Sequence, residues 1–146
     1  MGAVPKLRFP EFEGEWLESK LSELAELTSS KRVSQSQYVN HGVPFFRGKE
    51  ISELNSGKFP NDILYISEIS YKEFKSKFGA PSMGDILITA VGTLANTYHV
   101  SSNFSFYFKD GNLIWLRNVI LNSQFLEITL VVNKPKILKL AIGSSQ

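Results

Sequence analysis

The chain has 146 residues, of which 42% are hydrophobic and 21% charged, so it is long and apolar enough for one globular core and is not disordered. Its 11 Phe, 5 Tyr and 2 Trp indicate a sheet-rich fold, because bulky aromatic residues favour strands. Cysteine is absent, which excludes disulfides, zinc ribbons and thiol nucleophiles and suits a reducing cytoplasm. The two histidines, His41 and His99, lie far apart in the sequence, which disfavours a histidine metal site. No apolar run is long enough to span a membrane. We therefore expect a cytoplasmic protein with no metal, no other cofactor and no membrane contact.

The net charge of +2 is unevenly distributed along the chain. Residues 1–27 carry three Lys or Arg and six Glu, for a net charge of −3, whereas residues 28–146 carry thirteen Lys or Arg and eight Asp or Glu, for +5. A basic body of this kind can meet the phosphate backbone of a nucleic acid. An ordinary soluble surface explains the same balance equally well.

The first predicted elements are an extended segment and a short helix. Two prolines, Pro5 and Pro10, disfavour helix and predict an extended lead-in over residues 1–16. Leucines at positions 17, 21, 24 and 27 recur at helical spacing, which predicts an amphipathic helix with its apolar stripe against the core. The polar stretch over residues 28–37 is predicted to be a loop.

Short strands and turns are predicted through the middle of the chain. Residues 43–51 are predicted to be a strand that runs into a turn at Gly48. Further strands are predicted over residues 64–66, 86–90 and 96–100, with turns at Gly84-Asp85 and Gly92. Ser70 and Glu73 have the spacing of a capping box. That spacing predicts a helix from Ser70 to about Lys77.

The strongest local pattern lies at residues 104–116. Phe104, Phe106 and Phe108 alternate with more polar residues, so one face of the segment is aromatic. Asp110-Gly111 and the apolar run over residues 113–116 then complete the pattern that predicts a β-hairpin. The aromatic face is either core or, in an alternative interpretation, the exposed docking patch of a protein–protein adaptor.

Two helices are predicted near the C-terminus. One covers residues 123–132 after a cap at Asn122 or Ser123, and the other covers residues 135–141 with Pro135 in its first turn. The elements together predict an α+β fold, a single domain with a mostly antiparallel, twisted sheet and short helices near both ends. Its predicted parts are the lead-in over residues 1–16, an α+β body over residues 17–122 and C-terminal helices over residues 123–146.

Few residues match a catalytic motif. Asp62, Glu73 and Lys75 have roughly the spacing of a restriction nuclease, in which two carboxylates hold magnesium and a lysine stabilises the phosphate charge. Glu18-Ser19-Lys20 matches the second half of that motif equally well, and the helix cap already explains Glu73. A serine hydrolase is disfavoured because no serine lies in a Gly-x-Ser-x-Gly elbow. A small metal-dependent nuclease therefore stays as the alternative function.

Nucleic-acid binding needs only cations near phosphates and polar groups that reach base edges. The chain offers both, because cations are predicted in loops or at strand ends and polar side chains surround the turn at Gly92. The candidate DNA-binding residues are Lys31, Arg32, Arg47, Lys49, Thr89, Thr93, Asn96, Tyr98 and Lys109. Solvated loop residues would give the same pattern. Arg47 and Lys49 lie just beyond Pro44-Phe45-Phe46, at a strand end, so we expect them to contribute to DNA affinity and little to stability.

Three stretches resemble the specificity subunits of type I restriction–modification systems. They are Pro5–Trp16, Val43–Ile51 and Gly84–Leu94, the last with two glycines that bracket an apolar strand. The closing Ala141–Gln146 is similar to the segment that precedes the spacer helix of that family. The resemblance covers nearly the whole chain, and the order and spacing of the stretches are specific. One departure is Ala95, where the family often has glycine.

The resemblance implies a DNA-binding protein that is not an enzyme. In that family two target recognition domains, separated by long helices, each read half of a bipartite site in double-stranded DNA. Methylation and restriction subunits assemble around them. This chain would supply one recognition domain, as a half or truncated subunit, and a second copy or a second recognition domain would read the other half.

Overall fold

The computed structural model describes residues 3–143, and its side chains are described as far as residue 140. These residues form two four-stranded sheets. The first has the strand order β1 (Glu26–Thr28), β8 (Leu113–Arg117), β5 (Ile86–Thr89) and β6 (Thr97–His99). The second has the order β2 (Tyr38–Val39), β4 (Leu64–Ile66), β3 (Val43–Phe46) and β7 (Tyr107–Phe108).

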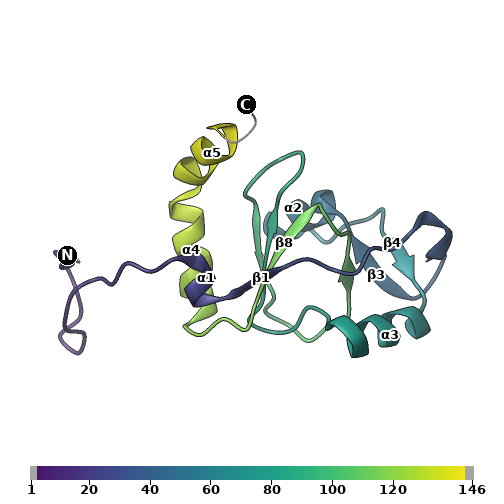
Figure 1. Cartoon of the computed structure of the whole chain (residues 1–146), viewed down its shortest axis with the longest axis horizontal. Coiled ribbons are helices and arrows are strands. Elements are labelled where there is room, and N and C mark those ends of the chain that lie inside the picture. Colours follow the sequence, from purple (N-terminus) through teal and green to yellow (C-terminus); the bar gives the residue numbers. More distant parts are fainter. Residues whose placement is uncertain (1–2, 144–146) are drawn as a thin grey trace.

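Helices flank the two sheets (Figure 1). They are α1 (Leu21–Leu24), the 3-10 turn η1 (Gln35–Gln37), α2 (Gly48–Asn55), α3 (Glu68–Phe78), α4 (Ser123–Val132) and α5 (Lys134–Gly143). Neighbouring strands are antiparallel, except that β3 and β7 run parallel. The predicted α+β fold, with mostly antiparallel strands and helices near both ends, is confirmed.

Three apolar clusters hold these layers together. The central cluster lies between the sheets and contains Phe46, Ile51, Leu87, Val100, Phe106, Phe108, Leu113 and Trp115. A second packs the other sheet onto α3 and includes Phe45, Ile66, Tyr71, Phe74 and Tyr107. A third packs the first sheet onto α4 and contains Ala25, Ile86, Ile88, Leu116 and Leu126. Successive side chains of a strand point to opposite faces, so inner strands such as β5 supply two clusters at once.

The predicted hairpin over residues 104–116 is wrong in its pairing. The turn forms, with Gly111 at a φ of +71°, but β7 pairs with β3 and β8 pairs with β1 and β5. The chain therefore passes from one sheet to the other instead of folding back on itself. Tyr107 is as fully buried as its neighbours Phe106 and Phe108, because α3 covers its face of the sheet. On the predicted aromatic face, Phe106 and Phe108 are fully buried and Phe104 is half-buried against the central cluster. This contradicts the adaptor interpretation, which needed these side chains to be exposed.

The predicted helix over residues 17–27 is much shorter in the structure. Only α1 is helical, and Ala25 is already extended, with φ −155° and ψ 158°. The next residues form β1, because their backbone pairs with the free edge of β8 from Glu26↔Arg117 to Thr28↔Trp115. Leu17 is 90% exposed, so the apolar stripe does not continue in that direction. Pairing with a sheet edge overrides the leucine spacing here.

Two further predictions are corrected at helix starts. Gly48 does not turn a strand but begins α2, eight residues long. The cap of α3 is Ser67 and not Ser70, because the Ser67 hydroxyl accepts the Ser70 N–H at 3.1 Å. Glu73, predicted as the capping acid, instead accepts a hydrogen bond from Lys77 at 2.7 Å.

Most of the remaining elements agree with the sequence predictions, although η1 and β2 were not predicted and the lead-in differs. The strands at 64–66 and 86–90 form as β4 and β5, and the strand at 96–100 forms as β6. Asn122 caps α4 by accepting the Phe125 N–H at 2.9 Å, and Pro135 lies in the first turn of α5. The lead-in forms neither helix nor strand, and it folds back on itself beside α4 instead of staying extended (Figure 1), because the Trp16 backbone N–H donates to the Ala3 carbonyl at 2.8 Å. The Trp16 ring stacks on Phe125 with centroids 5.9 Å apart.

Ala95 lies in the left-handed region, with a φ of +61°. Alanine is strained there and glycine is not, so Ala95→Gly should raise the free energy of unfolding by about 0.5 kcal/mol after the extra flexibility of glycine is counted. Chemical denaturation measures this. The matched control is Ala25→Gly, since Ala25 is equally buried but has a negative φ, and it should destabilise. A loss of stability in both variants would contradict the prediction.

Candidate nucleic-acid interface

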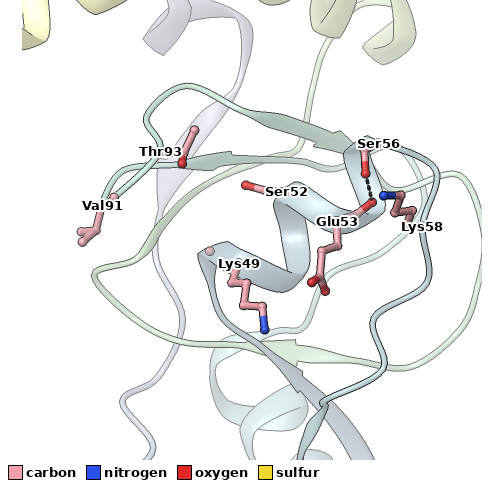
Figure 2. A pocket seen from close by; sticks show the side chains of 9 residues that line it. Lys49, Ser52, Glu53, Ser56, Lys58, Val91 and Thr93 are labelled. Carbon is pink, nitrogen blue, oxygen red and sulfur yellow. Dashed lines mark hydrogen bonds between the residues drawn. The ribbon is translucent and has the colours of Figure 1, made fainter.

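A groove of about 470 Å³ lies between α2 and the loop that joins β5 to β6 (Figure 2). The helix contributes mainly polar side chains, and the loop contributes its tip. The groove is lined by Gly48, Lys49, Ser52, Glu53, Ser56, Lys58, Val91, Gly92 and Thr93. Gly92 has a φ of +74°, so the tip makes the tight turn that the sequence predicted.

Helix α2 begins where it does because of an ion pair between Arg47 and Glu50. The Glu50 carboxylate is fully buried. It accepts the Arg47 backbone N–H at 2.7 Å and two side-chain bonds, from Nε at 3.1 Å and from Nη2 at 2.6 Å. A carboxylate three residues into a helix that bonds the cap backbone is a capping-box arrangement. The pair therefore fixes the first turn of α2 against the end of β3.

The same pair sets the ionisation of both groups. Burial alone would raise the pKa of Glu50, but the hydrogen bonds from Arg47 outweigh it, so the pKa lies below the ordinary value of 4.5. The hydrogen bond to Glu50 raises the pKa of Arg47, and the charge of Asp62 adds to this. Arg47 is thus paired with Glu50 and also lies in the field of the Asp62 carboxylate.

A second set of hydrogen bonds shapes the loop of the groove. The Thr89 hydroxyl donates to the Thr93 carbonyl at 2.5 Å and accepts the Asn96 N–H at 2.9 Å. The Ala95 N–H also donates to the Thr89 carbonyl at 2.9 Å. Thr89 is only 3% exposed, so its hydroxyl organises the loop from inside and does not face solvent.

Asn96 ties this loop to two helices. Its Nδ2 donates to the Ser52 hydroxyl of α2 at 2.9 Å, and its Oδ1 accepts from the Lys134 ammonium of α5 at 2.6 Å. Two further bonds join α4 to β6, between Thr97 and Glu127 at 2.8 Å and between His99 and Ser123 at 2.8 Å. The loop wall of the groove is therefore fixed to α2 and to the C-terminal helices.

The groove carries charges of both signs. Lys49 and Lys58 are exposed, and Glu53 is half-buried between them. Figure 2 shows Lys49 and Glu53 pointing to the same side of α2, with Lys58 beyond the end of the helix. Among the described residues, neither lysine lies within 4.0 Å of a carboxylate oxygen. Both ammonium groups can therefore meet an anion brought to the groove.

Six of the nine predicted DNA-binding residues lie in or near the groove. Lys49 and Thr93 line the groove, and Arg47, Thr89 and Asn96 form its framework as described above. The backbone N–H of Lys109 donates to the Phe46 carbonyl at 2.9 Å, which brings Lys109 next to Arg47 at the start of α2.

The other three predicted residues lie elsewhere. The Lys31 ammonium is 5.4 Å from the centroid of the Phe78 ring, at the end of α3, which Figure 1 shows on the side of the sheets away from α2. Arg32 is exposed in the same loop. Tyr98 packs against the central cluster, and burial raises the pKa of its hydroxyl.

Sequence reasoning missed four groove residues, namely Ser52 and Glu53 of α2 and Ser56 and Lys58 just after it. Their segment follows β3 closely, and the prediction placed a turn at Gly48 and no helix after it. Two signals could have identified the helix. Glu50 stands three residues after Arg47, as a capping acid does, and Ile51 and Leu54 are spaced for one helix face.

The nuclease alternative has no support in the described residues. Glu73 is paired with Lys77, and the Lys75 ammonium lies 5.9 Å from the centroid of the Tyr71 ring. Asp62 contributes to the surroundings of Arg47. Within the part of the chain that the structure describes, no group of three His, Cys, Asp or Glu side chains is placed to hold a metal ion. Nor is any helix there long and apolar enough to cross a membrane.

Comparison with known proteins identifies a relative. No family model matches the chain. It is 34% identical over 116 residues, or 79% of its length, to the "Putative type I restriction enzyme specificity subunit S.HindORF215P" of Haemophilus influenzae (strain ATCC 51907 / DSM 11121 / KW20 / Rd).

The chain is similar to a type I restriction specificity subunit. This confirms the resemblance that the sequence motifs indicated. The aligned part makes up 26% of the relative, so the chain spans about a quarter of that specificity subunit.

The Arg47–Glu50 pair predicts a cost for removing the arginine. Arg47→Ala leaves a buried carboxylate without its partner, and it should lower the free energy of unfolding by about 3 kcal/mol, the low end for such a loss because the guanidinium is one-third exposed. Adding Glu50→Gln should recover part of the loss. Arg32→Ala, at an exposed loop arginine, is the control and should change stability by less than about 0.5 kcal/mol. Urea denaturation that found Arg47→Ala equal to this control would contradict the structural role.

The lowered pKa of Glu50 predicts a pH dependence. A carboxyl whose pKa is lower in the folded than in the unfolded chain stabilises the fold above the unfolded value and loses that effect as pH falls through the folded value. The stability advantage of the wild type over Glu50→Gln should therefore be full above pH 4.5, the ordinary glutamate pKa, and shrink below it. Denaturation curves at several pH values measure the difference. A pH-independent difference would show that folding does not lower the pKa of Glu50.

Proposed function

We propose that the chain is a sequence-specific DNA recognition module of a type I restriction–modification system. It reads one half of a bipartite site in double-stranded DNA, and partner subunits carry out methylation and cleavage. The observation that carries the proposal is its similarity, over 79% of the chain, to a protein named as a type I specificity subunit. The groove beside α2 supports it, because exposed lysines and polar side chains there suit phosphates and base edges.

The side chains of the groove are suited to binding DNA and not to catalysis. The groove supplies cations and hydrogen-bonding groups, which bind DNA but break no bond. We therefore propose that the chain is not itself an enzyme and that methylation and restriction subunits are its protein partners. A second recognition domain, or a second copy of this chain, would read the other half of the site. The location consistent with these partners is the cytoplasm.

The first prediction concerns the two lysines of the groove. If each neutralises one phosphate, Lys49→Ala/Lys58→Ala should weaken binding to all duplexes similarly and reduce the slope of log affinity against log salt by about 2. Fluorescence anisotropy with a labelled duplex at several salt concentrations measures both effects. These lysines replace the pair Arg47 and Lys49 that the sequence favoured, because Arg47 is held by Glu50.

The matched control removes two lysines outside the groove. Lys72 lies on α3 and Lys136 on α5, and both side chains are exposed. Lys72→Ala/Lys136→Ala changes the net charge by the same amount, so it isolates position from charge. Equal salt slopes for the two double variants would contradict a groove-centred interface.

The second prediction concerns the chain on its own. One recognition module covers a short segment of duplex, so the isolated chain should bind DNA with a dissociation constant near the non-specific range of about 10⁻⁴–10⁻⁶ M at physiological salt. A second module held in place becomes an intramolecular partner and should raise affinity by about 10²–10⁴. Anisotropy titrations of the chain alone and of the assembly with methylation subunits compare the two. Nanomolar, site-selective binding by the isolated monomer would contradict this dependence.

A further inference from the structure

We propose that Glu53 is a base-reading residue and that the half-site read by this chain contains a cytosine recognised by its carboxylate. The proposal rests on the proposed DNA-binding function and goes beyond it, because it assigns a base to a side chain.

Helix α2 presents one polar stripe and one apolar stripe. Lys49, Glu53 and Ser56 are spaced i, i+4 and i+7, so they lie on one face, and all three line the groove. On the other face Ile51 is fully buried in the central cluster and Leu54 packs against it. A single helix of this kind can enter the major groove with its polar stripe towards the bases.

The two glutamates of α2 are in opposite states. Glu50 is fully buried and its carboxylate is satisfied by Arg47. Glu53 is half-buried, and among the described residues its carboxylate oxygens have neither a hydrogen bond nor an ion pair. Figure 2 shows its carboxylate pointing away from the helix, while its backbone carbonyl accepts the Ser56 hydroxyl at 2.8 Å. The side chain is thus held on an ordered helical turn with its carboxylate free.

A free carboxylate between Lys49 and Lys58 decides what the centre of the groove can bind. It repels phosphate, so a groove that bound only the DNA backbone would be weakened by it. It gains when it accepts a hydrogen bond from an amino group. Two bases offer such a donor in the major groove, cytosine at N4 and adenine at N6.

Cytosine fits a carboxylate better than adenine does. On adenine the N6 donor lies beside the N7 acceptor, which repels a second carboxylate oxygen, and an amide side chain suits that pair of groups. Cytosine presents its N4 donor without an acceptor of its own beside it. Glu53 therefore selects cytosine at one position, while Lys49 and Lys58 on either side contact the flanking phosphates.

Selection from a randomised duplex pool tests this. The purified 146-residue chain is used at low salt, and bound sequences are compared for the wild type, Glu53→Ala, Glu53→Gln and the control Glu18→Gln, an exposed glutamate between the lead-in and α1. The wild type and the control should enrich cytosine at one position, with about fivefold weaker binding when thymine replaces it. Glu53→Ala should lose that preference. Glu53→Gln should shift it to adenine, and the other positions should stay unchanged.

The outcomes separate this inference from the function on which it rests. Thermal melting should be unaltered in both Glu53 variants, which excludes unfolding as the cause of any change. Retention of the cytosine preference in either variant, or its absence in the wild type, would overturn the role of Glu53. Failure of the wild type to bind any duplex would instead contradict the proposed function.

Discussion

The buried carboxylate of Glu50 and its bonds to Arg47 determine where the groove can form. A charge without contact with solvent is tolerated only when it is paired and hydrogen-bonded, and Arg47 supplies both a guanidinium and a backbone N–H. That requirement starts α2 immediately after β3. The helix then buries Ile51 in the central cluster and presents Lys49 and Glu53 to the groove. Thus one ion pair connects the core to the proposed interface.

The sequence predicted many of the elements that depend on local signals, although it missed α2 and the cap at Ser67, and it failed where distant pairing decides. The cap at Asn122 and the turns at Gly84 and Gly92 are local, and they form as predicted. The hairpin failed because β7 and β8 are each buried on both faces by different layers, so alternation at Phe104–Phe108 did not identify their partners. The helix at Leu17–Leu27 failed because residues near its end pair with β8.

The candidate site was predicted only in part, for the same reason. Lys49 and Thr93 were singled out and do line one groove, since residues near turns are exposed whatever the topology. Their juxtaposition depends on Asn96, which bonds Ser52 of α2 and accepts from Lys134 of α5. No residue spacing in the sequence predicts these contacts, because Ser52, Asn96 and Lys134 lie far apart along the chain. The ion pair of Arg47 with Glu50 was not predicted, because Glu50 lies on a helix that the prediction had omitted.

The crossing of the chain between the sheets also governs the order in which the protein can assemble. Each sheet depends on a strand from the last third of the chain: β3 pairs with β7, and β1 pairs with β8. During synthesis β1 and one edge of β3 stay unpaired until residues 107–117 leave the ribosome. Non-local pairings of this kind make folding slow and leave intermediates open to aggregation. A nascent chain stopped before Leu113 would lack β8, the strand that joins β1 to β5, and with it any closed first sheet.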